Sequence, residues 1–519
     1  MMTWPQAAKL GTHVGAHFDS YFSMWRLAWI AHQLPLAPTE LFEGNIFYPQ
    51  RFALALSDPI LLPGVVAAPL LWAGVEAVTT YNLLILLSFV LSGVAMWMLA
   101  SRLTGSPAAG CLGGIIYAFA PYRFEHYFHL EILWGFWIPI ALLALHRACE
   151  RGRLVDGLRT GLVVMAQALS CLYYAVYLGM TLMLAGPLLV RWRDRDRART
   201  LTGLALGAAA AVLSVAVYVQ PLLTIRNEVV PREEAEAGRY SAALSSYLAA
   251  PPENRVYGSL TSGVGGPELR LFPGLASLVL VVGALLRPRR CALVYAAILA
   301  FAFAASLGTN APFFPAIRGA SDLVTMLRVP ARFGAVVLCA LAVLAAMGAA
   351  SLFSSIGSSR LRRAIALAFG AAMLVEYSTA VRLEAVEPPG TVYRWLATQP
   401  RGPVAELPMP LIDKLPGRDA EREYYSSVHW QPLLNGYSGY YPISHNALLF
   451  YISVFPGGHW IDILLGRGAR YIVVHERDMP AARAADALQR LELHPRLRRV
   501  GRFPDPNDPA WVFERIGDP

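Results

Sequence analysis

The sequence has little charge and almost no lysine. Only 15% of its 519 residues are charged, against about a quarter in a soluble globular protein. Lys9 and Lys414 are the only lysines, so the net charge of +9 comes from arginine. The five cysteines include no CxxC pair, which argues against a disulfide framework and a cysteine metal site. The sequence has no P-loop, no GxGxxG after a strand, no GxSxG and no HExxH, which argues against an ATP-driven pump, a Rossmann enzyme and a zinc protease.

Long apolar runs are what the sequence has in abundance. Hydrophobic residues make up 56% of the chain, and runs of membrane-spanning length recur between residues 59 and 383. A helix satisfies its own backbone polar groups in lipid, so we predict a polytopic α-helical membrane protein with about 10–12 spanning helices. The spanning segments recognised are 79–101, 108–121, 129–147, 158–171, 172–190, 200–223, 271–287, 291–308, 332–354 and 363–383.

Arginines cluster in short loops between these segments. The basic loops lie at residues 147–159, 191–199, 287–290 and 360–363. By the positive-inside rule these loops face the cytoplasm, and their placement beside apolar segments argues against a nucleic-acid partner. Residues 122–128, 224–270, 309–331 and everything after 383 are then predicted to face the other side.

The composition divides the chain into three predicted domains. They are a first outer loop with interfacial helices (1–78), a transmembrane bundle (79–383) and a small extracytoplasmic α/β domain (384–519). Short β-like runs at 404–407, 471–474 and 511–516 and a helix-like stretch at 481–493 support the last.

The apolar residues 59–77 are interrupted by Pro63 and Pro69, so they either span the membrane or lie along its outer surface. We favour the surface helix, which implies a further spanning helix upstream of residue 1.

Two carboxylates stand in the predicted first outer loop among aromatic residues that suit a membrane surface. Asp19 lies in a stretch in which Phe18, Trp25 and Trp29 mark the apolar face of a predicted helix. This carboxylate either acts as a general base toward an acceptor hydroxyl or caps the helix. Asp58 precedes a proline, which is a helix-start signal, but it can also bind a metal or an acceptor.

The predicted loop around residues 122–131 is rich in ionisable side chains, namely Arg123, His126, His129 and Glu131. Charges this close to a membrane usually face a cavity or a partner. Arg123 suits paired hydrogen bonds to a phosphate. His126 and His129 share a helix face at spacing i, i+3, which fits a metal, contacts to a donor phosphate or acceptor, or interfacial structure. No metal site of defined geometry follows from this spacing.

Arg328 and Arg332 precede a predicted spanning helix, with Pro330 in its first turn. The helix N-terminus favours an anion, so this pair is predicted to bind a pyrophosphate or lipid phosphate, with interfacial anchoring as the alternative.

In the outer domain, the aromatic and amide residues of 429–445 suit either a carbohydrate surface or the domain's own core.

Several phrases of the sequence resemble one family of membrane enzymes. They are FDSYFSMWRLAW, GNIFYP and SDPILLPGVVAAPL, then YAFAPYRFEHYFHLEILWGFWIPIALLAL, LRVPARF and LLNGYSGYYP. They resemble the GT-C superfamily of integral-membrane glycosyltransferases, which includes bacterial relatives of protein O-mannosyltransferases and lipid A aminoarabinose transferases. The resemblance implies an enzyme of the bacterial inner membrane and cell envelope. It would move a sugar from a polyprenyl-phosphate donor to an extracytoplasmic glycan, lipid or protein.

On this resemblance, Asp19 is the catalytic residue, which orients or deprotonates the acceptor. The departing phosphate is stabilised by Arg332, Arg328 and Arg123. The remaining substrate-binding residues are Asp58, His126, His129 and Glu131. Membrane lipids are expected partners, and a divalent metal stays open as a cofactor.

The alternative is a non-catalytic lipid or polysaccharide transporter or assembly factor on the same scaffold. Transporters place functional charges near the bilayer midplane. Here the charges cluster at one interface, with the exception of Glu376 in the last predicted span.

Overall fold

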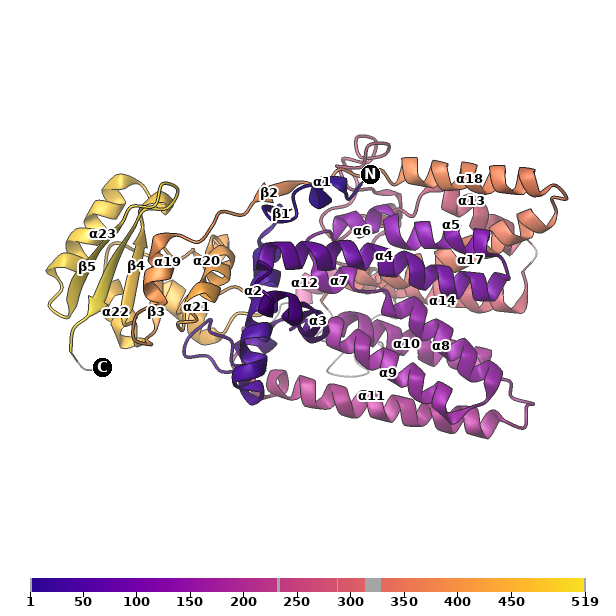
Figure 1. Ribbon diagram of the computed structural model, residues 1–519, viewed down its shortest axis with the longest axis horizontal. Helices are drawn as coiled ribbons and strands as arrows, with labels where there is room; N and C mark the ends of the chain where they lie inside the picture. The colour runs from indigo at the N-terminus through magenta and orange to yellow at the C-terminus, as the bar shows by residue number, and fades with distance from the viewer. Residues whose placement is uncertain (1, 231–233, 287, 313–327, 518–519) are drawn as a thin grey trace. The chain divides into compact units, whose positions relative to one another are not determined.

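The computed structural model describes residues 2–230, 234–286, 288–312 and 328–517 (Figure 1). Arg287 of one predicted basic loop and most of the predicted outer loop 309–331 lie outside them. The chain divides into two compact units. The first comprises residues 1–10, 82–217 and 232–383, and the second comprises residues 11–81, 218–231 and 384–519.

The first unit is a bundle of helices. Ten of these coincide with the ten predicted spanning segments. They are α4 (Ala77–Thr104), α5 (Pro107–Phe119), α8 (Trp137–Arg151), α9 (Leu154–Ser170), α10 (Leu172–Leu189), α11 (Arg197–Ile225), α13 (Leu275–Leu285), α14 (Arg290–Ser306), α17 (Gly334–Ser354) and α18 (Ser359–Glu376). Within the described ranges, 5 segments are long and apolar enough to cross a membrane: Ala77–Thr104, Leu130–Arg151, Leu172–Leu189, Arg197–Ala216 and Pro330–Ser354. The prediction of a multi-pass helical membrane protein is confirmed.

Helix α17 lies at the centre of this bundle, where it packs against α5, α13 and α14. Small side chains let these helices approach closely. A Cβ atom at Gly348 of α17 would lie 1.8 Å from the carbonyl oxygen of Leu280 in α13. Packing of small residues is the usual basis of helix association in lipid. The lipid tails are as apolar as the helix surfaces, so the hydrophobic effect does not drive the helices together.

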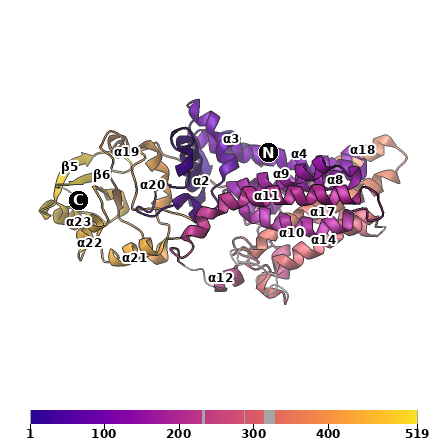
Figure 2. The same ribbon diagram turned by 90° about the horizontal axis from the view of Figure 1, so that it is seen from below.

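Helices α9 and α11 lie side by side (Figure 2) through two facing pairs of glycines. Gly157 and Gly161 of α9 meet Gly203 and Gly207 of α11, each pair at the small-xxx-small spacing. A Cβ atom on Gly161 would lie 2.1 Å from the carbonyl oxygen of Gly207, and one on Gly207 would lie 2.3 Å from that of Gly157. A side chain at either of these positions would therefore push the two helices apart.

Glu376 is the last residue of α18. The predicted span 363–383 was longer and placed this glutamate in the interior of a helix, which differs from the structure. Its carboxylate accepts hydrogen bonds from the backbone N–H groups of Leu275 (2.8 Å) and Ala276 (3.0 Å) and from the hydroxyl of Tyr257 (2.6 Å). These N–H groups form the first turn of α13 and have no partner within that helix. Glu376 thus caps α13, which accounts for a charge that the sequence left unexplained.

The second unit contains helices α2 (Phe18–Leu36) and α3 (Leu61–Trp72) and a four-stranded sheet. The sheet order is β3 (Val404–Leu407), β4 (Tyr471–His475), β6 (Ala510–Arg515) and β5 (Leu497–Phe503); β3 and β4 are parallel and the other neighbours antiparallel. Helices α19 (Thr391–Leu396), α20 (Asp419–Tyr425), α21 (Ile443–Tyr451), α22 (Trp460–Gly466) and α23 (Ala481–Leu493) complete the α/β region. The predicted α/β fold of the C-terminal region is confirmed.

Helix α3 lies within the apolar residues 59–77, for which the sequence left a spanning and a surface helix open. It has 12 residues, and a span of the bilayer needs about 20. Helix α2 packs against both α3 and α20, so the N-terminal segment and the C-terminal region share one core within this unit.

Candidate active site

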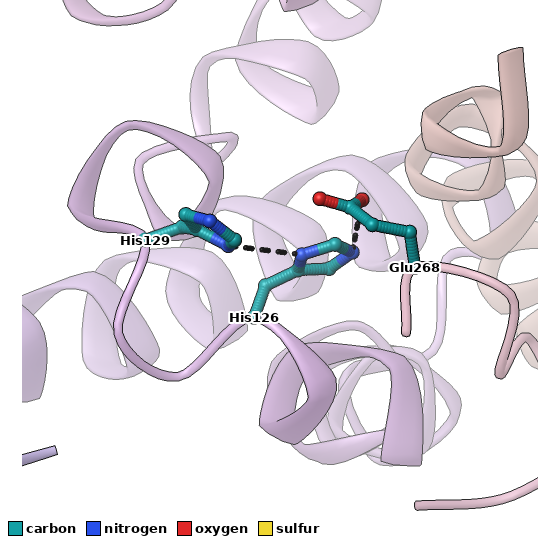
Figure 3. A group of neighbouring side chains, drawn as sticks. All are labelled: His126, His129 and Glu268. Carbon is teal, nitrogen blue, oxygen red and sulfur yellow. Dashed lines mark hydrogen bonds and ion pairs between the residues drawn. The ribbon is translucent and has the colours of Figure 1, made fainter. Parts of the chain in front are cut away.

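Two histidines and a carboxylate meet in the first unit, where the loop after α6 (Pro121–Glu125) approaches the loop before α13 (Figure 3). His126 Nδ1 lies 3.4 Å from His129 Nδ1, and His126 Nε2 lies 3.7 Å from a carboxylate oxygen of Glu268. One ligand atom from each residue lies within 4.8 Å of the others. The sequence singled out both histidines but not Glu268.

Glu268 is held in a left-handed backbone conformation, with a φ of 71°. A non-glycine residue in this region stores roughly 1–3 kcal/mol of strain, and such residues gather at functional sites. Glu125 holds the strained segment, because its carboxylate accepts a hydrogen bond from the Glu268 N–H (3.1 Å) and two from Arg270 (3.2 and 3.1 Å). These contacts fix the backbone that directs the Glu268 side chain.

Arg332 supplies the positive charge of this cluster. It lies in a 3-10 turn (Pro330–Phe333) directly before α17 and is buried. Its Nε and Nη2 donate to the two carboxylate oxygens of Glu268 at 3.0 and 2.5 Å, a bidentate pair. Arg328, predicted to act with Arg332, pairs instead with Glu236 at 3.0 Å. Arg328 and Arg332 therefore each have their own carboxylate in this structure.

The protonation states follow from these contacts. Burial lowers the pKa of His126 to about 3, so its imidazole is neutral at physiological pH. Burial alone would raise the pKa of Glu268, but the Arg332 guanidinium holds it well below its usual range. Among the described residues, His126 Nε2 has no hydrogen-bond partner although the side chain is 1% exposed. A neutral imidazole and an ionised carboxylate are the states in which both groups bind a cation or accept a hydrogen bond.

Two other predicted residues lie at the edge of this cluster. Arg123 is buried, and its Nη2 donates to Ser92 Oγ (3.1 Å) and to the carbonyl oxygen of Leu133 (2.7 Å). These bonds tie α6 to α4 and to α7 (Leu130–Leu133). Glu131 lies half-buried in the first turn of α7.

Asp19 lies in the second unit, in the first turn of α2. The N-cap is His17, whose Nδ1 accepts a hydrogen bond from the Asp19 N–H at 3.2 Å, so Asp19 is not the cap. The Tyr437 hydroxyl donates to Asp19 Oδ1 at 2.7 Å. The Tyr437 ring stands edge-on to Phe18 and Phe22, with both centroid distances 5.1 Å. The LLNGYSGYYP segment therefore orients the carboxylate of the predicted catalytic residue.

Asp58 is buried in the same unit, and its carbonyl oxygen accepts a hydrogen bond from Arg26 of α2 at 2.5 Å. Helix α3 starts only at Leu61 with Ile60 as its N-cap, so Asp58 does not cap that helix. The structure thus places Asp19 and Asp58 in the second unit and the other predicted site residues in the first.

The amide and aromatic residues of 429–445 include several core positions. Asn435 is fully buried, and its side chain bonds the backbone N–H and C=O of Glu406 at 2.8 and 2.9 Å. His429 and His445 are also buried. These contacts favour the core interpretation over a carbohydrate surface.

Comparison with solved structures shows the fold of this protein. The chain has the fold of the GT-C superfamily of membrane glycosyltransferases. Arabinofuranosyltransferase AftD from Mycobacteria is similar over 100% of this chain, with a TM-score of 0.59 and 15% identity. This chain spans 40% of AftD. At this identity the likeness concerns the fold alone.

Two further structures show weaker similarity. ArnT from Cupriavidus metallidurans in the apo state is 13% identical, with 99% of this chain and 97% of that chain covered and a TM-score of 0.48. The oligosaccharyltransferase AglB from Archaeoglobus fulgidus is 12% identical, with 96% and 70% covered and a TM-score of 0.47.

The chain belongs to the family described as domain of unknown function DUF6311, whose model matches residues 31–375. No curated protein matches the sequence.

Proposed function

We propose that this protein is a glycosyltransferase that transfers a sugar from a polyprenyl-phosphate donor to an extracytoplasmic glycan, lipid or protein in a bacterial inner membrane. One observation carries the proposal. A strained glutamate, a buried arginine and a neutral histidine gather at the loop ends of an apolar helical bundle with the GT-C fold. Burying such groups is costly unless they meet a ligand or each other.

In the proposed reaction, the acceptor hydroxyl attacks the anomeric carbon of the donor sugar. A carbon–oxygen bond to the acceptor forms, and the bond to the phosphate oxygen breaks. The hydroxyl proton passes to Asp19, and the electron pair leaves with polyprenyl phosphate. The Tyr437 hydroxyl donates a hydrogen bond to Asp19 Oδ1 and so orients the carboxylate to accept this proton.

Arg332 is proposed to stabilise the departing phosphate, with Arg328 and Arg123 as further cations. A guanidinium offers a phosphate the same bidentate geometry that it now offers Glu268. The phosphate would therefore compete with Glu268 for Arg332. Release of Glu268 would leave its carboxylate free to bond His126, which lies 3.7 Å away.

A divalent metal at His126, His129 and Glu268 is proposed as a cofactor. Two imidazoles and a carboxylate suit a borderline cation such as Zn²⁺ or Mn²⁺. When bound, the metal would balance negative charge on a phosphate oxygen. Its binding requires neutral imidazoles, and burial keeps His126 neutral at physiological pH.

The test is transfer of radiolabel from polyprenyl-phosphate sugars to membrane extracts by the purified full chain. Asp19→Asn is expected to abolish transfer. Asn keeps an oxygen that can accept the Tyr437 hydrogen bond, so the variant removes mainly the charge. Glu40→Gln, at an exposed carboxylate in the same unit, is the matched control. Full activity of Asp19→Asn would refute its catalytic role, and no transfer by the folded wild type would favour a non-catalytic protein.

A further inference from the structure

A cavity of about 330 Å³ lies at the carboxyl ends of the two parallel strands of the C-terminal sheet. Residues 408–410, which follow β3, form one wall, and Asp478, which follows β4, forms another. In open α/β sheets this edge is where ligands bind, because the loops that leave the strands diverge there. The proposed transfer reaction uses none of the side chains that line the cavity.

The charged side chains of the cavity wall are mainly cationic. It carries Lys414, Arg418, Arg422 and Arg483 but a single carboxylate, Asp478. Arg422 and Arg418 share that carboxylate at 2.8 and 3.4 Å. In the described part of the chain, Lys414 forms no ion pair, and Arg483 bonds only the carbonyl oxygen of Phe455. Lys414 and Arg483 therefore present positive charge to a ligand.

The other lining is apolar and continues onto an exposed surface. Leu449, Ile452 and Phe455 line the cavity. Three of the residues between them in sequence point outward: Phe450 is 66% exposed, Tyr451 61% and Val454 63%. Exposed aromatic and aliphatic side chains gathered in one place mark an interaction surface. Here they adjoin the unpaired cations.

We propose that this β3–β4 cavity binds an anionic amphiphile, with a phosphate head against Lys414 and Arg483 and an apolar chain along α21. Basic residues beside exposed aromatic and aliphatic side chains are the usual surface for an anionic lipid. A free phosphate would leave the apolar rim uncovered. A neutral lipid would leave both cations without a counter-charge. The amphiphile alone satisfies both halves of the surface.

The test titrates the purified full chain in detergent with short-chain phosphatidylglycerol and counts bound molecules by native mass spectrometry. Short-chain phosphatidylcholine and inorganic phosphate are the comparison ligands. Phosphatidylglycerol is expected to bind about tenfold more tightly than either. Lys414→Glu and Arg483→Glu should each weaken its binding by about tenfold, since each replaces an attractive charge with a repulsive one. Arg394→Glu, at an exposed arginine of α19, is the matched control and should change nothing.

Two results would overturn the proposal. Inorganic phosphate that binds as tightly as the lipid, with the same sensitivity to both variants, would make this a free-phosphate site. Lipid binding that neither variant weakens would place the amphiphile elsewhere on the protein. The measured quantity is binding and not sugar transfer, so this test succeeds or fails independently of the proposed enzymatic activity.

Discussion

The two units each bury a histidine beside carboxylates, and one of these histidines is neutral whereas the other is a cation. In the sheet cluster (His475, Glu406, Asp508 and Tyr393), His475 bonds Glu406 through Nε2 at 2.9 Å and Asp508 through Nδ1 at 2.8 Å. Tyr393 donates to the same Glu406 oxygen at 2.9 Å. Burial alone would lower the pKa of His475, but the bonds to Asp508 and Glu406 raise it to about 9. This histidine is a cation.

In the bundle cluster (His126, His129, Glu268 and Arg332), burial lowers the pKa of His126 to about 3. The difference is not burial, since His126 is 1% and His475 0% exposed. It arises because Glu268 already has Arg332 as its counter-charge, whereas Glu406 bonds His475 directly. The buried histidine is protonated where it is the direct partner of the carboxylate, and neutral where an arginine already balances the carboxylate's charge. We infer that the sheet cluster is structural and that the bundle cluster keeps binding capacity for a ligand.

The largest expected effect is on the stability of the sheet. His475→Leu removes the cation and leaves Glu406 and Asp508 facing each other's charge across an apolar side chain. Breaking a buried pair in this way costs about 3–5 kcal/mol. Hydrogen exchange of the β4 amides, which reports local stability in a protein of several parts, should show a matching loss of protection. Unchanged exchange would contradict the structural role.

The second effect is on activity. His126→Asn should lower sugar transfer by about 100-fold, the range for loss of a positioned polar group in a reaction site. The Arg332–Glu268 pair persists in this variant, so the fold should stay intact. His459→Asn, at an exposed histidine, is the matched control. Bound metal, measured by elemental analysis, should fall together with activity. Normal transfer by His126→Asn would remove the bundle cluster from the mechanism.

The third effect is a pH dependence of stability in the C-terminal α/β region. The pKa of His475 is raised from 6.5 to about 9 on folding, so its contribution is complete below pH 6.5 and is lost as the pH rises through 9. Burial also raises the pKa of Asp419 from 3.8 to about 7. The stability of the fold therefore also falls at this residue as the pH rises, between pH 3.8 and 7. The His475 contribution should fall by about 2 kcal/mol between pH 7 and 9. In His475→Leu, exchange of the β4 amides should lose this component, and a wild type without any pH dependence would contradict the assigned charge.

The smallest expected effect tests whether the contact between Asp19 and Tyr437 is functional, like the bundle cluster, or structural, like the sheet cluster. Tyr437→Phe removes the hydroxyl that donates to Asp19 Oδ1 and keeps the ring between Phe18 and Phe22. Loss of a hydrogen bond to a charged group should lower the turnover number about tenfold, with the affinity for donor unchanged. Tyr48→Phe, at an exposed tyrosine outside both clusters and the proposed lipid surface, should have no effect. A loss of stability without a loss of turnover would assign Tyr437 a structural role only.

Most of the fold was readable from the sequence, because apolar length and period determine helices in a membrane protein. The predicted segments coincide with helices of the bundle, and the β-like runs with β3, β4 and β6. Strand β5 was missed because its arginines hide the apolar alternation. The glycine contacts of α9 and α11 were missed because they depend on which helices become neighbours.

The candidate site was readable only in part. His126, His129 and Arg332 stood out because ionisable residues are unusual beside apolar segments. Glu268 did not, because a glutamate in a polar loop is ordinary and its left-handed backbone leaves no trace in the sequence. The contact between Asp19 and Tyr437 joins residues 418 positions apart, and no local pattern reports it.

The most direct measurement compares His126→Asn and His475→Leu side by side, with sugar transfer expressed per folded molecule and β4 protection recorded on the same samples. We predict that His126→Asn keeps wild-type protection but loses transfer. His475→Leu should lose protection but keep transfer per folded molecule. The reverse pattern, or a single pattern shared by both variants, would contradict the assignment of the bundle cluster to function and the sheet cluster to structure.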